Sequence, residues 1–283
     1  LHPQHRRQRQ MCIRDSLSTR PNYLYNLSIK TIEGKYADLF YSDEVSELIN
    51  EDKIIISDLT AELYSINIGD ILVLVGMNEE TTELEVGDII SDPEIGWFEG
   101  LVSKKIGYQL GINRNIQAII WDRRITENHF VELYRNIKDK QLRVTFRDSK
   151  PNKNWVLPTA LIKNYFGDFQ IKERDGTWIT IEPDWRNENI ERKSMPIIGR
   201  ATCNKIMWEP LLGALNQIIK EGLDDTLSKE EFQTSGGCYA PRRINRFNAG
   251  GAISRHAWGI AIDINVKSGY HPRVVEIFNS WGF

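Results

Sequence analysis

Short runs of apolar residues separated by turn residues fill the first half of the chain. β-Branched runs bounded by Asp, Gly and Asn predict strands, and they occupy residues 52–58, 70–76, 85–91, 116–121 and 141–148. Apolar residues at helical spacing predict helices over 96–112 and 126–139, although internal glycines weaken the first. Strands interleaved with helices indicate a small α/β-type domain.

The pattern changes in the second half of the chain. Residues 169–183 alternate around Asp175-Gly176, which predicts a hairpin with a tight turn. Residues 183–199 are polar, punctuated by proline and aperiodic, so we interpret them as a linker with a domain boundary near residue 190. A helix is predicted over 204–222, ending at Gly222. Its apolar stripe comprises Met207, Leu211, Leu215, Ile218 and Ile219. The expected fold class is α+β, with an N-terminal domain at 21–190 and a second domain at 191–283.

Composition excludes several classes of protein. The chain has 283 residues, enough for two modest domains, and 41% of them are hydrophobic, so a core can be buried. Lys and Arg total 36 against 39 Asp and Glu, a formal charge of −3, which argues against a nucleic-acid partner. No run approaches the roughly 20 apolar residues that cross a bilayer.

The first 20 residues differ from the rest of the chain. They begin without Met, have no apolar stretch and carry five Arg against one Asp. A signal peptide requires an apolar region behind its charges, so this segment is not one. It resembles read-through of a sequencing adapter, and we interpret residues 1–20 as foreign or disordered. The native N-terminus is then missing, together with any export signal or membrane anchor.

Outside that segment the chain has two cysteines, Cys203 and Cys238, 35 residues apart in sequence. They are compatible with a disulfide, with two buried thiols or with metal ligands, and the lack of a CxxC pair argues against a zinc finger. Both lie in the segment that leads into residues 251–265. We favour a disulfide and therefore an exported protein.

Residues 251–265, GAISRHAWGIAIDIN, place a carboxylate within an apolar alternation. A strand over 260–265 would put the three isoleucines on one face and Ala261, Asp263 and Asn265 on the other. A bend at Gly259 would return His256 to the face of Asp263, where the two side chains suit zinc with an open position for water. Alone, His256 is compatible with a core histidine, and Asp263 with a carboxylate satisfied by backbone N–H groups.

The full pattern S-x-H-x-x-G-x-A-x-D resembles the signature of the zinc D-alanyl-D-alanine carboxypeptidases of the VanY type. That family shares its fold with L-alanyl-D-glutamate endopeptidases and hedgehog domains, and the resemblance to its bacterial branch covers about residues 195–283. It implies Zn²⁺ as cofactor, with His256 and Asp263 as two of three ligands, and a domain with a central antiparallel sheet. It also implies that Arg242 holds the substrate's terminal carboxylate and that Ser254 lies near the bound peptide.

Arg242 suits that task chemically, because a guanidinium binds a carboxylate through two parallel hydrogen bonds. Its neighbours Arg243, Arg246 and Arg255 leave open the alternative that it is one of several solvated charges.

The chain departs from the family after Asp263. The expected D/E-x-x-H-[FW] element, with the third ligand and the general base, is missing, because His271 and Glu276 stand in the wrong order. Residues 271–283 instead predict a helix with Pro272 in its first turn. We therefore expect the general base to lie beyond Phe283 and this chain to show little turnover.

Three hypotheses follow. The first is an extracytoplasmic zinc peptidase that hydrolyses peptidoglycan stem peptides, secreted or anchored at the membrane. The second is a non-catalytic module that binds the same cell-wall peptides. The third is an interaction protein whose role lies in its N-terminal domain, where residues 57–76 loosely resemble extracytoplasmic domains of ABC-type permease subunits.

Overall fold

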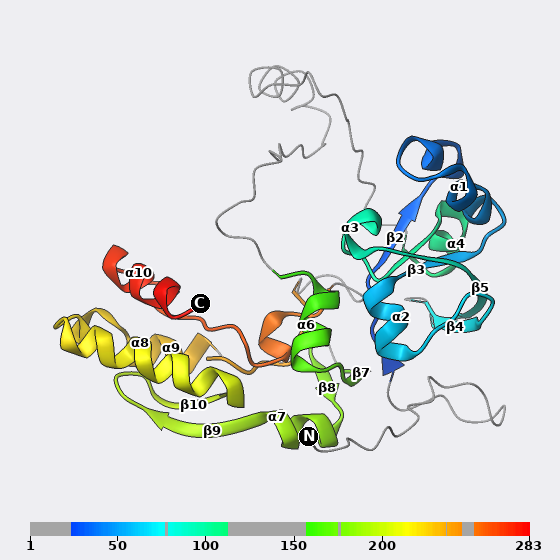
Figure 1. The fold of residues 1–283 in the computed structure, drawn as a ribbon. Coiled ribbons are helices and arrows are strands. Elements are labelled where there is room, and N and C mark those ends of the chain that lie inside the picture. Colours follow the sequence, from blue (N-terminus) through cyan, green and yellow to red (C-terminus); the bar gives the residue numbers. More distant parts are fainter. Residues whose placement is uncertain (1–23, 77–78, 113–156, 175–176, 236, 245–251) are drawn as a thin grey trace, which may run out of the picture.

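The computed structural model describes residues 24–76, 79–112, 157–174, 177–235, 237–244 and 252–283. Within these residues the chain has an α+β fold with mixed and antiparallel sheets (Figure 1). Residues 1–20, the strands predicted at 116–121 and 141–148 and the helix predicted at 126–139 lie outside the described residues.

A five-stranded mixed sheet forms the centre of the N-terminal half. Its strands, in spatial order, are β2 (Ile29–Ile32), β6 (Gly100–Ser103), β3 (Ile54–Ser57), β5 (Thr81–Ile90) and β4 (Ile71–Val75). The β2–β6 and β3–β5 pairs are parallel, and the β6–β3 and β5–β4 pairs are antiparallel. The strand predictions at 52–58, 70–76 and 85–91 are confirmed.

Helices pack on this sheet because its central strand is apolar on both faces. Ile54 and Ile56 belong to one core cluster, whereas Ile55 belongs to another on the opposite face, as strand alternation requires. The covering helices are η1 (Gly34–Leu39), α1 (Asp43–Asn50), α2 (Asp58–Tyr64), α3 (Asp92–Ile95) and α4 (Lys104–Gln109).

The single helix predicted over 96–112 is wrong for its first half. Residues 100–103 form β6 and are all buried, so they carry no alternation that would reveal a strand. Ser103 then begins α4 by accepting a hydrogen bond from the Ile106 amide at 3.2 Å. The apolar spacing that looked helical spans this strand–helix junction.

The C-terminal half is built around α8 (Trp208–Lys220), which confirms the helix predicted there. Leu211, Leu215 and Ile218 are buried, whereas Ile219 is exposed, so the stripe is narrower than expected. Near α8 lie α9 (Lys229–Ser235) and α10 (Pro272–Ser280), the second of which confirms the helix predicted after His271 (Figure 1). The short elements η3 (Lys205–Met207) and η4 (Asp224–Thr226) adjoin α8 in sequence, and η5 (Arg255–Ala257) packs on the side of the hairpin over residues 170–181.

The linker predicted over 183–199 is wrong. Pro183 starts α7 (Pro183–Asn189), and β9 (Ile190–Met195) pairs antiparallel with β10 (Gly199–Asn204). Trp185 of α7 is buried in a cluster that also holds Phe169 and Trp258. Packing therefore continues across residue 190, on both sides of the boundary placed there.

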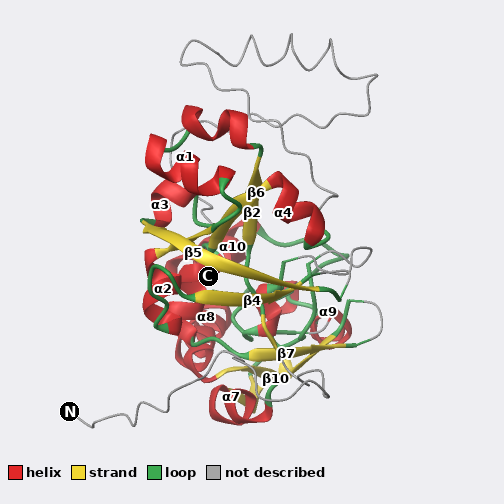
Figure 2. Ribbon diagram, turned by 90° about the vertical axis from the view of Figure 1, so that its right-hand side faces the viewer, coloured by secondary structure: helices red, strands yellow, loops and turns green. Residues whose placement is uncertain are grey.

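The hairpin predicted over 169–183 is confirmed. Strands β7 (Gln170–Glu173) and β8 (Ile179–Ile181) pair antiparallel, and β1 (Leu24–Tyr25) adds a third strand beside β7. The turn residues 175–176 lie outside the described residues. Helix α6 (Thr159–Phe166) lies beside this hairpin, between the two halves of the molecule (Figure 1). Figure 2 shows β4 beside β5 at the edge of the five-stranded sheet.

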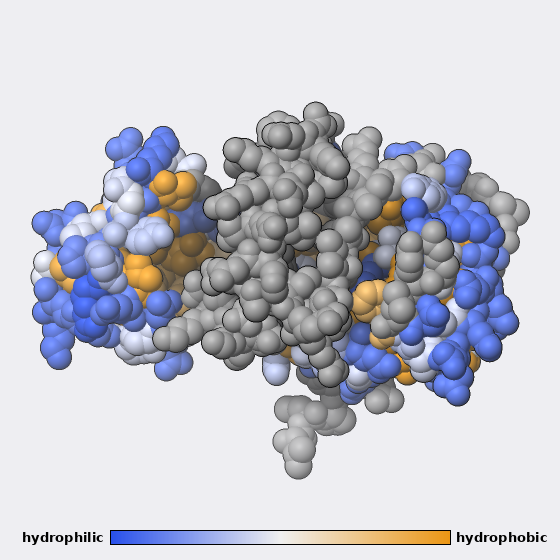
Figure 3. All heavy atoms as spheres, turned by 90° about the horizontal axis from the view of Figure 1, so that it is seen from above, coloured by the Kyte–Doolittle hydropathy of each residue, from blue (hydrophilic) through white to orange (hydrophobic). Residues whose placement is uncertain are grey.

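The surface in Figure 3 is mainly hydrophilic at both ends of the molecule, with small apolar patches among the hydrophilic residues of each end. None of the helices in the described part of the chain is long and apolar enough to cross a membrane.

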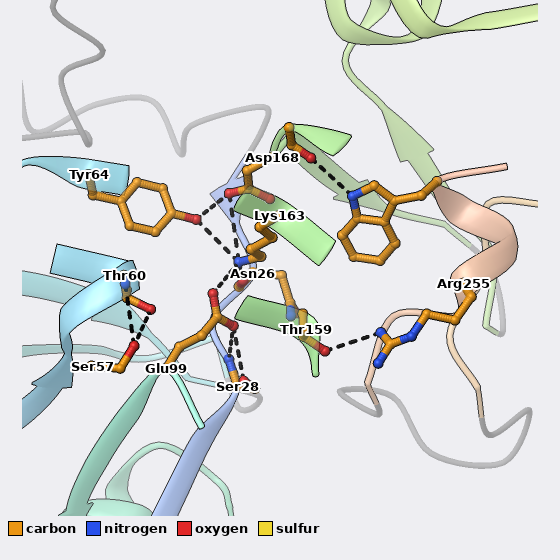
Figure 4. Close-up of polar contacts among 12 residues, drawn as sticks. Asn26, Ser28, Ser57, Thr60, Tyr64, Glu99, Thr159, Lys163, Asp168 and Arg255 are labelled. Atoms are coloured by element: carbon orange, nitrogen blue, oxygen red, sulfur yellow. Dashed lines mark hydrogen bonds and ion pairs between the residues drawn. The ribbon is translucent and has the colours of Figure 1, made fainter. Parts of the chain in front are cut away.

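A buried charge network joins the two halves at α6 (Figure 4). The Lys163 ammonium is 0% exposed and lies 2.7 Å from Glu99 Oε1 and 3.7 Å from Asp168 Oδ2. It also donates to the Tyr64 hydroxyl at 3.2 Å, and this hydroxyl donates to Asp168. Glu99 Oε2 accepts two hydrogen bonds from Ser28. Every charge in the network thus has an oppositely charged or hydrogen-bonding partner.

Burial and mutual attraction compete in this network. Burial opposes the charge of Lys163, but the two carboxylates outweigh it and the pKa of Lys163 is raised. Burial also raises the pKa of Asp168, against the effect of Lys163. Removing the lysine would leave two buried carboxylates without their cation, which is far more costly than never having buried the pair.

Lys163→Met is expected to lower the free energy of unfolding by about 3–5 kcal/mol, because it leaves Glu99 and Asp168 uncompensated. The measurement is urea unfolding of the full chain. The control is Lys104→Met, which removes an exposed ion pair with Glu33 at 3.4 Å and should cost less than about 1 kcal/mol. If Lys163→Met lowered the free energy of unfolding as little as the control does, Lys163 would not be the buried cation that compensates Glu99 and Asp168.

A second ion pair joins α8 to α10 at the surface. Arg273 donates to both carboxylate oxygens of Glu221, at 2.8 and 2.9 Å, and hydrogen bonding to Arg273 lowers the pKa of Glu221 to about 2. Because the folded pKa lies below the usual 4.5, this pair stabilises the fold above pH 4.5 and the stabilisation is lost as the pH falls towards 2.

Stability measured from pH 5 to about pH 2 should therefore fall less steeply in Glu221→Gln than in the unchanged protein. Thermal unfolding across this range is the measurement. Parallel curves for the two proteins would show that the pair does not link the helices in solution.

Candidate active site

Two extended segments widen the three-stranded sheet towards the C-terminal half. Residues 241–243 run antiparallel to 177–179, with amide-to-carbonyl distances of 2.8 and 3.1 Å. Residues 252–256 run antiparallel to 240–244 on the other side, at 2.8, 2.9 and 3.0 Å. The SRH part of the motif is thereby held in register by backbone hydrogen bonds that do not depend on its side chains.

This register decides which side chains face the site. Arg242 lies opposite Trp178 in one bridge and accepts the amide of Ser254 on its other side, so these three residues share a face. Arg243 and Ile253 form the adjacent bridge and occupy the opposite face, where both are buried. Of the two neighbouring arginines, the register therefore turns Arg242 towards the site and Arg243 towards the interior.

The chain then bends sharply at Gly259, as the sequence predicted. Gly259 has φ +69°, and a Cβ atom there would lie 2.7 Å from the backbone nitrogen of Asn204. Asn204 holds the bend by donating its amide to the Gly259 carbonyl at 3.0 Å and its side chain to the Trp258 carbonyl at 3.1 Å. A side chain at position 259 would separate the motif from the end of β10.

His256 is buried and held through one ring nitrogen. Its Nδ1 lies 3.1 Å from the Cys238 carbonyl, and Nε2 lies 3.2 Å from Asp263 Oδ2. A carbonyl can only accept, so we assign a proton to Nδ1, and Nε2 is the ring nitrogen that faces Asp263. The side chain of Asp263 is 34% exposed, so the pair opens towards solvent.

The carbonyl that orients His256 belongs to a cysteine in a disulfide. Cys203 of β10 and Cys238 are bonded, with 4.9 Å between their Cα atoms, and both are fully buried. The next residue, Tyr239, donates its amide to Thr202 at 2.9 Å. Residue 238 is thus fixed to β10 covalently and by hydrogen bonding, and His256 is oriented against this fixed point.

Arg242 completes the arrangement. Its Nη2 lies 3.9 Å from Asp263 Oδ2, whereas Arg243 binds Glu173 and Arg255 donates to Thr159 and to the Leu157 carbonyl. Arg246 lies outside the described residues. The structure therefore brings Arg242, His256 and Asp263 together and directs Arg243 and Arg255 elsewhere.

Desolvation acts on two residues flanking the site. Burial lowers the pKa of Arg255, and burial raises the pKa of Tyr239 against the opposing effect of Arg186. Both groups are thus partly removed from water.

Ser254 has a structural task in this arrangement. Its hydroxyl accepts the His256 amide at 3.4 Å and caps η5, and the residue is buried. It therefore helps to set the start of the turn that carries His256. The role of Ser254 beside a bound peptide, implied by the resemblance, stays a prediction.

Residues 260–264 are not a strand, which corrects the prediction for 260–265. They have no regular secondary structure, and their isoleucines pack partly buried against the core around α8. Asn265 does not share the face of Asp263 as expected. It has φ +51° and is buried, bonding Ser228, Thr226 and Gly269.

His271 and Glu276 do not join the pair. His271 begins α10 by accepting the Arg273 amide at 3.2 Å, and Glu276 binds the Arg273 side chain at 2.9 Å. Among the residues that the structure describes, no group of three His, Cys, Asp or Glu side chains is placed to hold a metal ion.

Two groups at the candidate site were not identified from the sequence, the Cys238 carbonyl and Trp178. The carbonyl of Cys238 carries no signal in the sequence, because any residue has one. Trp178 does carry one, since it alternates with Ile179 and Ile181 and must point away from their buried face.

Comparisons with protein-family models, curated proteins and solved structures find no match to this chain.

The disulfide gives a direct chemical prediction. With Cys12 replaced by Ser, thiol titration of the denatured, unreduced chain should detect no free thiol, because Cys203 and Cys238 are bonded. Replacing both by Ser should then lower the free energy of unfolding by about 2–5 kcal/mol. Detection of two thiols per chain, or unchanged stability in the double variant, would refute the bond.

Proposed function

We propose that the face formed by Arg242, His256 and Asp263 is a zinc-dependent peptidase site for peptidoglycan stem peptides. One observation carries the proposal: His256 directs Nε2 to a point 3.2 Å from Asp263 Oδ2 while Nδ1 is bound to the Cys238 carbonyl. Metal-bound histidines usually donate their other ring N–H to such an acceptor, which fixes the tautomer and the ring.

The donor atoms fit a zinc ion chemically. Imidazole nitrogen and carboxylate oxygen are common zinc ligands, and two ligand atoms on a tetrahedral zinc lie about 3.4 Å apart. The observed 3.2 Å between Nε2 and Oδ2 is close to that spacing. The third ligand and the general base are not among the described residues. For this chain the proposal therefore concerns the binding of zinc and peptide, and not turnover.

Each residue then has a defined task. A bound zinc would polarise the scissile carbonyl and lower the pKa of its water to about 7. Arg242 would bind the terminal carboxylate of the peptide through its guanidinium fork, and this places the adjacent peptide bond beside His256 and Asp263. Oxidising surroundings suit the disulfide, which supports an extracytoplasmic location.

The alternative is a non-catalytic module that binds cell-wall peptides. The same 3.2 Å separation is compatible with a direct His256–Asp263 ion pair, and no third ligand group is found in the described part of the chain. In that case Arg242 alone would provide the affinity for carboxylate, and metal would have no effect.

Calorimetric titration separates the two hypotheses. The full chain should bind one zinc ion, and His256→Ala and Asp263→Ala should each weaken zinc affinity by at least about 10-fold, since each removes one of two ligands. His271→Ala is the matched control, because this histidine caps α10, and its zinc affinity should stay unchanged.

The metal site would be ruled out if the unchanged chain bound no zinc, or if His271→Ala lost as much zinc affinity as His256→Ala and Asp263→Ala. Binding of a D-alanyl-D-alanine-ended peptide in EDTA, abolished by Arg242→Gln, would then support the binding module.

A further inference from the structure

Trp178 lies at the edge of the candidate site and differs from the chain's buried tryptophans. Its side chain is 47% exposed, whereas Trp185, Trp208 and Trp258 are at most 6% exposed. Residues on either side of it, Thr177 and Ile179, are buried on the opposite face of the sheet. Strand alternation therefore holds a large apolar ring in solvent at this position, although it adds nothing to the core.

The backbone ladder places this ring beside Arg242. The two residues form a bridge in which the hydrogen bonds are made by their neighbours, at 2.8 and 3.1 Å. In such a non-hydrogen-bonded antiparallel pair, the two side chains project from the same face and lie closest together. The side chain of Trp178 thus leaves the sheet next to that of Arg242, whose guanidinium lies 3.9 Å from Asp263.

The order of residues across the ladder gives the ring a defined position relative to a ligand. Trp178 lies on one side of Arg242, and Ser254 and the His256 turn lie on the other. A carboxylate bound by Arg242 would have its peptide bond directed to His256 and Asp263. The side chain of the same terminal residue would then be free to contact the indole.

We propose that Trp178 is a specificity-determining residue that contacts the side chain of the ligand's C-terminal residue. This inference rests on the proposed function and adds the residue that would select the terminal side chain of the ligand. The ring offers a flat uncharged surface, so burial of a methyl group against it is favourable and burial of a charged side chain is not. Trp and Arg, which lie side by side here, are also the residue types enriched where binding energy is concentrated.

The test compares two pentapeptides that differ only in their last residue, D-alanine or glycine. The full chain should bind the D-alanine peptide about 4-fold more tightly, the effect of burying one methyl group. Trp178→Ala should remove this preference by weakening only the D-alanine peptide, and Trp178→Thr, which suits a strand, should do the same.

Trp178→Phe keeps an apolar ring and should retain the preference. The control Tyr165→Ala removes an aromatic ring that is 68% exposed on α6, and it should change neither affinity. Calorimetry or fluorescence anisotropy with labelled peptides provides the measurement.

The specificity role would be overturned if Trp178→Ala and Trp178→Thr kept the preference for the D-alanine peptide, or if they weakened both peptides equally. Either result would leave the proposed function standing. Failure of the unchanged chain to bind either peptide would instead overturn the proposed function, and the role of Trp178 with it.

Discussion

The backbone ladder between residues 177–179, 240–244 and 252–256 is the constraint on which the candidate site depends. It sets the face of Arg242 and delivers His256 to the bend at Gly259. None of these bonds involves a functional side chain, so the positions are fixed before any ligand arrives. This arrangement agrees with the general rule that precise sites are built on rigid elements and supported by surrounding contacts.

The site also depends on packing that spans the chain. Trp258, next to the bend, is fully buried and donates to the Gly167 carbonyl at 3.0 Å, and its ring lies 4.7 Å from that of Phe169. Gly167 and Phe169 follow α6, whose Lys163 is buried against Glu99 of the N-terminal half. The motif is therefore supported by a segment far from it in sequence, and this segment is attached to the five-stranded sheet.

Strong local periodicity made some elements predictable. Helix α8 has a long apolar stripe, α10 begins with Pro272, and the β7–β8 hairpin alternates cleanly. The polar stretch at 183–199 misled because α7 and β9 are half exposed, and Trp185 alone carries much of their burial. Residues 260–264 alternate like a strand but have no strand beside them within the described residues, and pairing cannot be read from one segment.

The same distinction applies to the site. The approach of His256 to Asp263 was predictable, because glycine at position 259 permits the bend that joins them. The choice of Arg242 over its neighbours came from the motif resemblance, and the ladder register supplies the physical reason for it. The role of the Cys238 carbonyl needed the three-dimensional structure. Sequence motifs identify side chains, whereas the backbone groups that orient them leave no trace in residue type.

The central claim is that His256 and Asp263 together hold a metal ion. Crystals of the chain grown with zinc and measured at the zinc absorption edge test it most directly. The account predicts an anomalous peak within bonding distance, about 2.0–2.2 Å, of both His256 Nε2 and an Asp263 carboxylate oxygen. Zinc peaks elsewhere in the crystal, with His256 and Asp263 in direct contact and no peak between them, would contradict it.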